Sequence, residues 1–142
     1  MNTIPEIEQK IIEEFNRFDE WLDRYNYLIE LGRECPPISE SEKIEANLIK
    51  GCQSRVWLGT EFVGGKVVFR ADSDAVITKG IASLLIRVLS NQTPDDIMNA
   101  DLTFLDTIGL RTHLSPTRSN GLTSMIKQMK LYAMAYKMKM GK

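Results

Sequence analysis

The sequence is poor in the side chains that hold metal ions. Among its 142 residues are one histidine and two cysteines, and Cys35 and Cys52 stand 17 positions apart. This spacing gives neither a Cys-x-x-Cys redox pair nor a zinc pattern. A zinc or iron site built from Cys35, Cys52, His113 and a carboxylate would have no support from spacing. We therefore expect no bound metal.

The sequence also lacks long apolar runs. None approaches the roughly 18 residues that would predict a membrane-spanning helix. The first residues include Glu6 and Glu8, whereas a signal peptide would show a basic region followed by an apolar stretch. We expect a cytoplasmic protein with no membrane partner and, in that reducing compartment, no structural disulfide. The length predicts a single domain over residues 1–142.

Charge of one sign is missing from the end of the chain. Residues 1–45 hold twelve acidic and five basic side chains, whereas residues 111–142 hold seven basic and no acidic ones. One interpretation of the basic segment is a phosphate or membrane contact. The preferred one is a solvated helix face packed near the acidic N-terminal helix. The net charge of −1 gives no reason to expect nucleic-acid binding.

The first part of the chain has a helical pattern. Apolar residues recur every three or four positions from Ile4 to Ile29, which predicts one long amphipathic helix. Gly32 is placed to end this helix, and Pro36-Pro37 prevents its continuation. Ser39 or Ser41 is expected to cap a short helical piece near residues 42–48.

The period changes to two between Arg55 and Asp72, which predicts two strands. The intervening Val63-Gly64-Gly65-Lys66 is a strong hairpin signal. Because a stable sheet needs a third strand, we place a candidate for it in residues 44–49. Strands that are few and separated in sequence from the helices predict an α+β fold, with helices covering an antiparallel sheet.

Three more helical segments are expected after the hairpin. Asp72-Ser73-Asp74 is predicted to cap a helix over residues 77–89, and a short helix is predicted to begin at Pro94. Residues 107–118 look irregular. Ser119 or Asn120 is expected to cap a final helix that runs to about Lys139.

Cys52 is the strongest candidate for chemistry. It follows Gly51, which frees the backbone and removes a side chain near the sulfur. Lys50 and Arg55 flank it with no carboxylate between them, a pattern that favours the thiolate, the nucleophilic form. The alternative is a buried small apolar residue, the commonest fate of a free cysteine. The local sequence leaves both interpretations open.

Three motifs now resemble those of the SufE family of sulfur-acceptor proteins. They lie in the family's order, and the similarity extends over nearly the whole chain. The motifs are Gly51-Cys52-Gln53-Ser54-Arg55-Val56-Trp57-Leu58, then Asp72-Ser73-Asp74-Ala75 with Lys79-Gly80, and Leu114-Ser115-Pro116-Thr117-Arg118-Ser119-Asn120-Gly121-Leu122. The resemblance implies a fold shared with iron–sulfur scaffolds of the IscU and NifU type.

The resemblance also implies a function. Such proteins take sulfane sulfur from a cysteine desulfurase of the SufS or CsdA type and stimulate that enzyme. They carry the sulfur as a cysteine persulfide, here on Cys52, and deliver it to an iron–sulfur scaffold of the SufB type. Pyridoxal phosphate belongs to the desulfurase, so no cofactor is expected on this chain. Whether such an accessory sulfur-transfer protein counts as an enzyme is a matter of convention.

Other residues in or next to the three motifs receive supporting roles. Arg55 is a candidate for stabilising the thiolate, His113 for accepting its proton, and Arg118 for holding the cysteine loop or contacting the desulfurase. Each also has a structural alternative: a position on the hairpin surface, in a loop, or in a helix-cap salt bridge. Asp74, Gly51 and Gln53 are candidates for the partner interface, although helix capping would also explain Asp74. Gly80 is expected to pack against the hairpin, and Gly121 to begin the last helix.

Two other functions remain open at this point. One is a scaffold that assembles an iron–sulfur cluster itself, which would require three or four cysteine or histidine ligands. The other is a regulatory protein whose docking alone alters the desulfurase, with Cys52 in a structural role. Cys35 precedes two prolines and has only Arg33 as a nearby cation, so we expect it to be a bystander.

Overall fold

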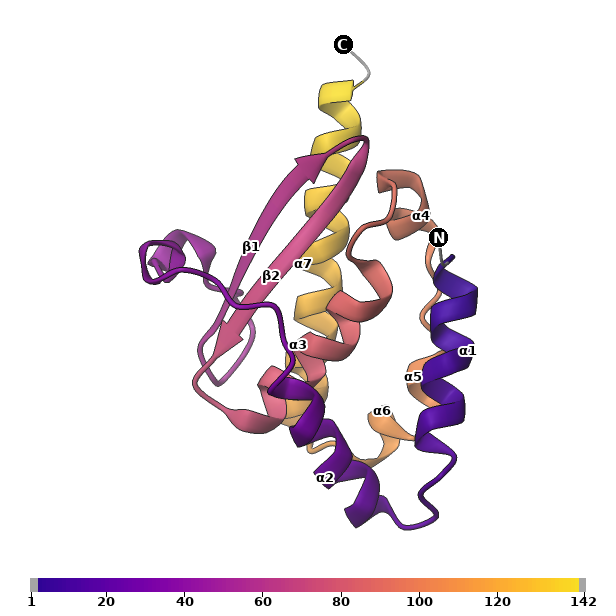
Figure 1. Ribbon diagram of the computed structural model, residues 1–142. Helices are drawn as coiled ribbons and strands as arrows, with labels where there is room; N and C mark the ends of the chain where they lie inside the picture. The colour runs from indigo at the N-terminus through magenta and orange to yellow at the C-terminus, as the bar shows by residue number, and fades with distance from the viewer. Residues whose placement is uncertain (1–2, 141–142) are drawn as a thin grey trace.

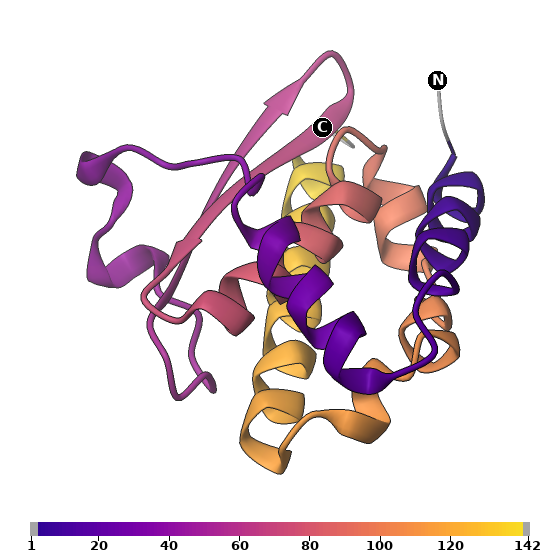
Figure 2. The same ribbon diagram turned by 60° about the horizontal axis from the view of Figure 1, so that its bottom comes forward.

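Helix α3, Val76–Leu89, lies at the centre of the fold in the computed structural model, which describes residues 3–140. Nearly every residue of α3 is buried, because other elements surround it (Figures 1 and 2). A helix that is apolar on most of its surface belongs in the core. The elements packed against it are α1 (Ile4–Phe15), α2 (Trp21–Gly32), β2 (Lys66–Ser73) and α7 (Pro116–Met140).

The hairpin forms as predicted. Strand β1, Val56–Val63, pairs antiparallel with β2, and the pair Val63↔Lys66 closes the turn. Gly64 and Gly65 have φ of 58° and 81°, the positive values that a tight two-residue hairpin turn requires. Figure 1 shows the hairpin lying against α3 and α7. The expected α+β class, with helices covering an antiparallel sheet, is confirmed.

The prediction of a third strand in residues 44–49 is wrong. Two 3₁₀ turns occupy this region, η1 (Glu40–Glu42) and η2 (Glu45–Asn47), and only an isolated bridge joins Leu48 to Trp57 of β1. Ser39 caps η1 in a reciprocal arrangement with Glu42, so the predicted residue does act as a cap, but on a turn that begins earlier than the helical piece expected near residues 42–48. The hairpin therefore obtains its packing from the helices rather than from a further strand.

The prediction of a single long N-terminal helix is also wrong, because the chain turns between α1 and α2. The side chain of Arg24 holds the turn: Nε donates to the Phe18 carbonyl at 2.9 Å and Nη1 to the Ile108 carbonyl at 2.9 Å. Both helices bury one face in the same core, so the apolar period continues across the break. Helix α2 ends at Gly32, as predicted.

Gly80 packs against α2 rather than the hairpin, which corrects the prediction for this residue. A β carbon on Gly80 would lie 2.2 Å from the Leu28 carbonyl oxygen, and one on Gly32 would lie 2.9 Å from the Gly80 nitrogen. The two glycines therefore allow α2 and α3 to approach each other closely.

Two predicted helix caps are wrong. Ala75, which has no polar side chain, is the N-cap of α3 and makes no side-chain cap bond, and Asp74 instead accepts from the Arg55 N–H. Helix α7 begins at Pro116, earlier than Ser119 or Asn120, and the Ser115 Oγ accepts from the Arg118 N–H at 3.3 Å. Residues 107–118 are also more regular than expected, since they take in the end of α5 (Phe104–Thr107), α6 (Leu110–His113) and the start of α7.

The basic end of α7 packs against α4, Pro94–Asn99, the short helix predicted at Pro94. Lys137 forms an ion pair with Asp95, and the Lys130 Nζ donates to the Ala100 carbonyl at 2.6 Å. The acidic partner of this segment is thus α4 rather than the N-terminal helix. Lys142 lies outside the described residues. Within residues 3–140, no helix combines the length and apolar character needed to cross a membrane.

Candidate functional site

Cys52 lies in a short loop, residues 50–55, whose two ends are fixed. At the first end, the Ile49 N–H donates to the Val56 carbonyl at 2.9 Å. At the other, the Arg55 N–H donates to Asp74 Oδ1 at 3.0 Å, and the Ser73 Oγ donates to the Arg55 carbonyl at 2.8 Å. The loop therefore projects from a base that belongs to the hairpin and the start of α3.

Gly51 brings the loop against α7. Its φ is 93°, in the left-handed region that residues with a side chain rarely adopt. A β carbon at this position would also lie 2.4 Å from the Ser124 Oγ. Both the backbone conformation and the close approach require glycine immediately before the cysteine.

The sulfur of Cys52 faces the first turns of α7. Its Sγ donates to the Gly121 carbonyl at 3.6 Å, and the side chain is half-buried. A β carbon on Gly121 would lie 3.5 Å from the sulfur. Gly121 thus lies inside α7, rather than at its beginning as predicted, and leaves space beside the thiol.

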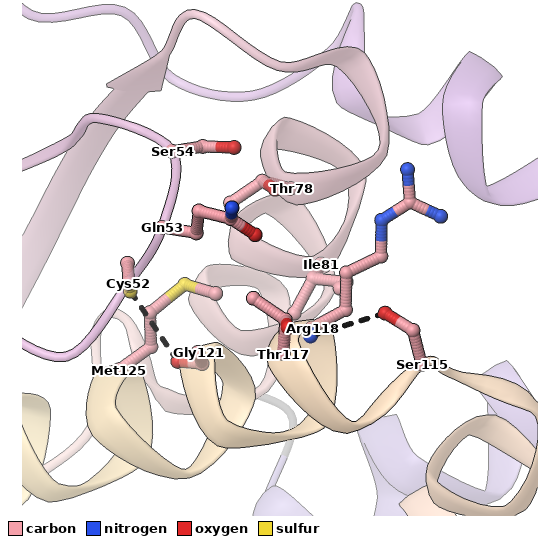
Figure 3. A pocket seen from close by; sticks show the side chains of 10 residues that line it. All are labelled: Cys52, Gln53, Ser54, Thr78, Ile81, Ser115, Thr117, Arg118, Gly121 and Met125. Carbon is pink, nitrogen blue, oxygen red and sulfur yellow. Dashed lines mark hydrogen bonds between the residues drawn. The ribbon is translucent and has the colours of Figure 1, made fainter.

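A pocket of about 250 Å³ opens beside the sulfur (Figure 3). Its walls come from three segments that are distant in sequence. The cysteine loop contributes Cys52, Gln53 and Ser54; α3 contributes Thr78 and Ile81; the start of α7 and the residue before it contribute Ser115, Thr117, Arg118, Gly121 and Met125. The first segment corresponds to the first motif, the α3 residues flank Lys79-Gly80 of the second motif, and the last segment covers the third motif and the residues after it.

The environment of the thiol is less electropositive than its sequence neighbours indicate. Burial raises the pKa of the Cys52 thiol, and no charged group among the described residues contributes to that shift. Lys50 and Arg55 are both exposed, where solvent screens their charge. The prediction that they favour the thiolate in the free protein is therefore wrong, because burial and not their charge is the cause that shifts the pKa of the thiol.

Arg118 lines the same pocket but does not approach the sulfur. Figure 3 shows its guanidinium directed away from Cys52. The Nη1 donates to the Tyr25 hydroxyl of α2 at 2.9 Å. Arg118 therefore ties the start of α7 to α2, and among the described residues its side chain makes neither a bond to the cysteine loop nor a helix-cap salt bridge.

His113 is not among the residues that line the pocket. Its ring stacks on Trp21, with centroids 4.4 Å apart and an interplanar angle of 16°. Its Nδ1 contacts the Gly109 carbonyl at 2.8 Å. The structure therefore does not bring His113 to the thiol as a proton acceptor.

The remaining predicted residues lie on or near the loop. Gln53 lines the pocket and is exposed. Arg55 and Asp74 are also exposed, and they meet through the backbone N–H of Arg55. Asp74 thus holds the loop base instead of capping α3.

Sequence reasoning missed much of the pocket wall. Thr117, Gly121 and Met125 are spaced four apart, the interval that aligns side chains on one helix face, and this spacing could have indicated them. Thr78 and Ile81 carried no signal of their own, because their role depends on how α3 packs against the loop.

Cys35 does not line this pocket and lies in the core. It is 5% exposed, and its Sγ donates to the Ala71 carbonyl at 3.6 Å. Burial, as the largest cause, raises the pKa of Cys35 to about 11. A search of residues 3–140 finds no group of three or more histidine, cysteine or acidic side chains arranged to hold a metal ion.

The whole architecture has a counterpart among solved structures. A hypothetical protein from Thermus thermophilus, determined in solution, superposes with a TM-score of 0.75 over 91% of this chain and 94% of its own, at 22% identity. This likeness shows a shared fold: helices packed on an antiparallel sheet.

Sequence comparisons identify the family. The family model SufE, described as an Fe-S metabolism associated domain, matches residues 9–133. An uncharacterised SufE-like protein of Synechocystis sp. is 36% identical over 136 residues, which cover 96% of this chain and 86% of the relative. The chain belongs to the SufE family, and its role lies in iron–sulfur metabolism.

Proposed function

We propose that this protein accepts sulfane sulfur from a pyridoxal-phosphate-dependent cysteine desulfurase as a persulfide on Cys52. It then delivers the sulfur for iron–sulfur cluster assembly. The observation that carries the proposal is the setting of Cys52: a half-buried thiol on a loop fixed at both ends, beside an open pocket. Membership of the SufE family supports the same conclusion.

The transfer step needs no external oxidant or reductant. The thiolate of Cys52 attacks the terminal sulfur of a persulfide on the desulfurase cysteine, as a thiolate attacks a disulfide. An S–S bond forms to Cys52 while the S–S bond in the donor breaks, and the donor cysteine leaves as a thiolate. The zero-valent sulfur changes carrier, and a single proton is lost from Cys52.

Burial of the thiol in the free protein disfavours this step until a partner docks. Burial raises the pKa of Cys52, so the nucleophilic form is scarce in the free protein. Since few contacts hold the sulfur itself, chiefly the 3.6 Å bond to Gly121, docking that draws the loop outward removes the burial that suppresses ionisation. The same shelter would protect the persulfide from solution reductants before delivery.

Stimulation of the desulfurase follows from the transfer. Each time Cys52 removes a sulfur, the donor cysteine returns to the thiolate that begins the next turnover. Pyridoxal phosphate belongs to the desulfurase in this scheme. The pocket beside Cys52 contains Thr78, Thr117 and Arg118 as polar lining, and we assign it to the partner's active-site segment rather than to a cofactor.

The experiment is a reconstituted transfer with purified desulfurase and free cysteine. Intact-mass and peptide analysis should show one added sulfur on Cys52, together with faster alanine production. Cys52→Ser should abolish both effects, whereas Cys35→Ala, which removes the other thiol, should preserve both. Faster turnover with no mass gain would instead indicate regulation by docking alone. Iron with acid-labile sulfide in the purified protein would indicate a scaffold.

A further inference from the structure

A second hollow lies beside the cysteine loop and shares no lining residue with the Cys52 pocket. It measures about 440 Å³ and runs between residues 46–50 and the middle of α7. Two lysines line it, Lys50 and Lys127, and no carboxylate does. The other lining residues are polar or apolar: Ala46, Asn47, Leu48, Ser124, Gln128, Leu131 and Tyr132. We call this hollow the lysine groove.

The charge of the lysine groove is uncompensated. Neither Lys50 nor Lys127 forms an ion pair with any residue between 3 and 140, and both are exposed. Residues 111–142 contain no acidic side chain, so the α7 wall cannot supply a counter-charge. Two cations lining one groove favour an anionic occupant.

An unpaired strand edge continues the groove. Val67 and Phe69 of β2, which stand opposite Phe62 and Thr60, direct their N–H groups away from β1, to Gln92 and Ser90. In an antiparallel ladder the residues opposite them face outward likewise. Thr60 and Phe62 thus present their backbone groups at the outer edge of β1, and no described residue bonds to them.

The edge and the lysine groove join end to end. Leu48, which lines the groove, forms the isolated bridge to Trp57 on the same side of β1, three residues before Thr60. Tyr132 lines the groove, and Tyr136, one turn further along α7, stacks on Phe62 with centroids 5.1 Å apart. Figure 1 shows the outer side of β1 free of other elements beyond the segment that contains η1 and η2.

A further feature favours a protein segment over a small anion. Leu131, which lines the groove, is 42% exposed on α7, so an apolar side chain borders the two lysines.

We propose that the lysine groove and the Thr60–Phe62 edge together bind an extended, acidic segment of a partner protein. The segment adds a strand to β1 through Thr60 and Phe62. Its carboxylates pair with Lys50 and Lys127, and an apolar side chain covers Leu131. This site does not rest on sulfur transfer at Cys52, although Lys50 belongs both to the lysine groove and to the cysteine loop.

The test uses the full ¹⁵N-labelled chain and the probe acetyl-Glu-Val-Glu-Val-Glu-Val-Glu-amide. We expect amide chemical shifts of Thr60, Phe62, Lys50 and Lys127 to change on titration, and binding to weaken with salt. Lys50→Glu combined with Lys127→Glu should weaken binding by roughly tenfold or more. Lys10→Glu is the matched control, because Lys10 is exposed on α1, which contributes to neither the lysine groove nor β1, and it should leave affinity nearly unchanged.

Backbone pairing is tested separately from charge. Two versions of the peptide carry N-methyl groups, one on the glutamates and the other on the valines, so that each blocks one hydrogen-bonding edge of the segment. One version should lose binding and the other should retain it. Equal binding of both versions, equal binding of a peptide with lysine in place of glutamate, or shifts confined to other surfaces would overturn the proposal.

Discussion

Gly51 and Ser124 lie so close together that a β carbon on residue 51 would be 2.4 Å from the Ser124 Oγ. The first prediction is that Gly51→Ala displaces the cysteine loop from α7. Left-handed backbone adds a cost of about 1–2 kcal/mol for a residue with a side chain. We expect a lower free energy of unfolding in urea and faster alkylation of Cys52.

The steric and backbone parts of this effect can be separated. Gly64 also has a positive φ, of 58°, but open space surrounds it. Gly64→Ala is therefore the control: it should show only the backbone cost and leave the rate of Cys52 alkylation unchanged. Adding Ser124→Gly to Gly51→Ala should restore slow alkylation in part. Wild-type alkylation in Gly51→Ala would contradict the close packing of loop and helix.

The second prediction concerns the pH dependence of Cys52 reactivity. Because burial raises its pKa, the alkylation rate should rise with pH about a midpoint that is higher in the folded protein than in the urea-unfolded chain. Measurement in Cys35→Ala isolates the signal. A folded midpoint below the unfolded one would mean that Lys50 and Arg55 govern the thiol after all.

The third prediction concerns acid stability. The hydrogen bonds from Arg87, with a smaller contribution from Tyr27, hold the pKa of Glu14 at about 2. A carboxyl group whose pKa is lowered by folding stabilises the fold at every pH above its unfolded pKa, which is near 4.5. This contribution is lost as the pH falls from 4.5 toward the folded pKa of about 2. Glu14→Gln should cost about 1–2 kcal/mol at neutral pH, allowing for partial exposure.

Urea unfolding at several pH values checks this expectation. The difference between wild type and Glu14→Gln should shrink between pH 4.5 and about 2. The neighbouring Glu13 is exposed and lies outside the Arg87 contact, so Glu13→Gln is the matched control and should have little effect at any pH. A constant difference for Glu14→Gln would mean that its cost is not electrostatic.

The fourth prediction tests the contact between α2 and α3. A β carbon at Gly80 would lie 2.2 Å from the Leu28 carbonyl oxygen, and backbone cannot give way as a flexible side chain can. Gly80→Ala should destabilise the protein by about 1–3 kcal/mol or more. Gly121→Ala, with its nearest contact at 3.5 Å, should gain up to about 1 kcal/mol from helix propensity. Effects of the same sign would contradict the assignment.

Features encoded locally were predictable from the sequence. The hairpin follows from two glycines between alternating strands, and the loop position of Cys52 follows from its small and polar neighbours. The break between α1 and α2 was not predictable, because Arg24 fixes it through a carbonyl of residue 108. The function of Asp74 was missed for a similar reason: a loop N–H distant in sequence bonds to the carboxylate that was expected to cap α3.

Charged residues near Cys52 in the sequence were the least reliable guide to the properties of the folded site. Lys50 and Arg55 flank Cys52 in the sequence, yet their exposure leaves burial as the cause that determines the thiol pKa. The family motifs pointed to Cys52, which the structure places on a loop beside a pocket. They placed His113 and Arg118 beside it as candidates, but the side chains of both bond to groups away from the sulfur.

The fixed ends of the cysteine loop set a limit on its travel. Ile49 and Arg55 are held to the hairpin and the start of α3, so six peptide units join the two anchors. A fully extended segment of this length spans roughly 20 Å. Because both of its ends stay at the base, the middle of the loop can move at most about 10 Å away from it. If a partner protein held the sulfur deeper than this below its own surface, the Cys52 backbone could not reach that depth, however tightly the two proteins bound.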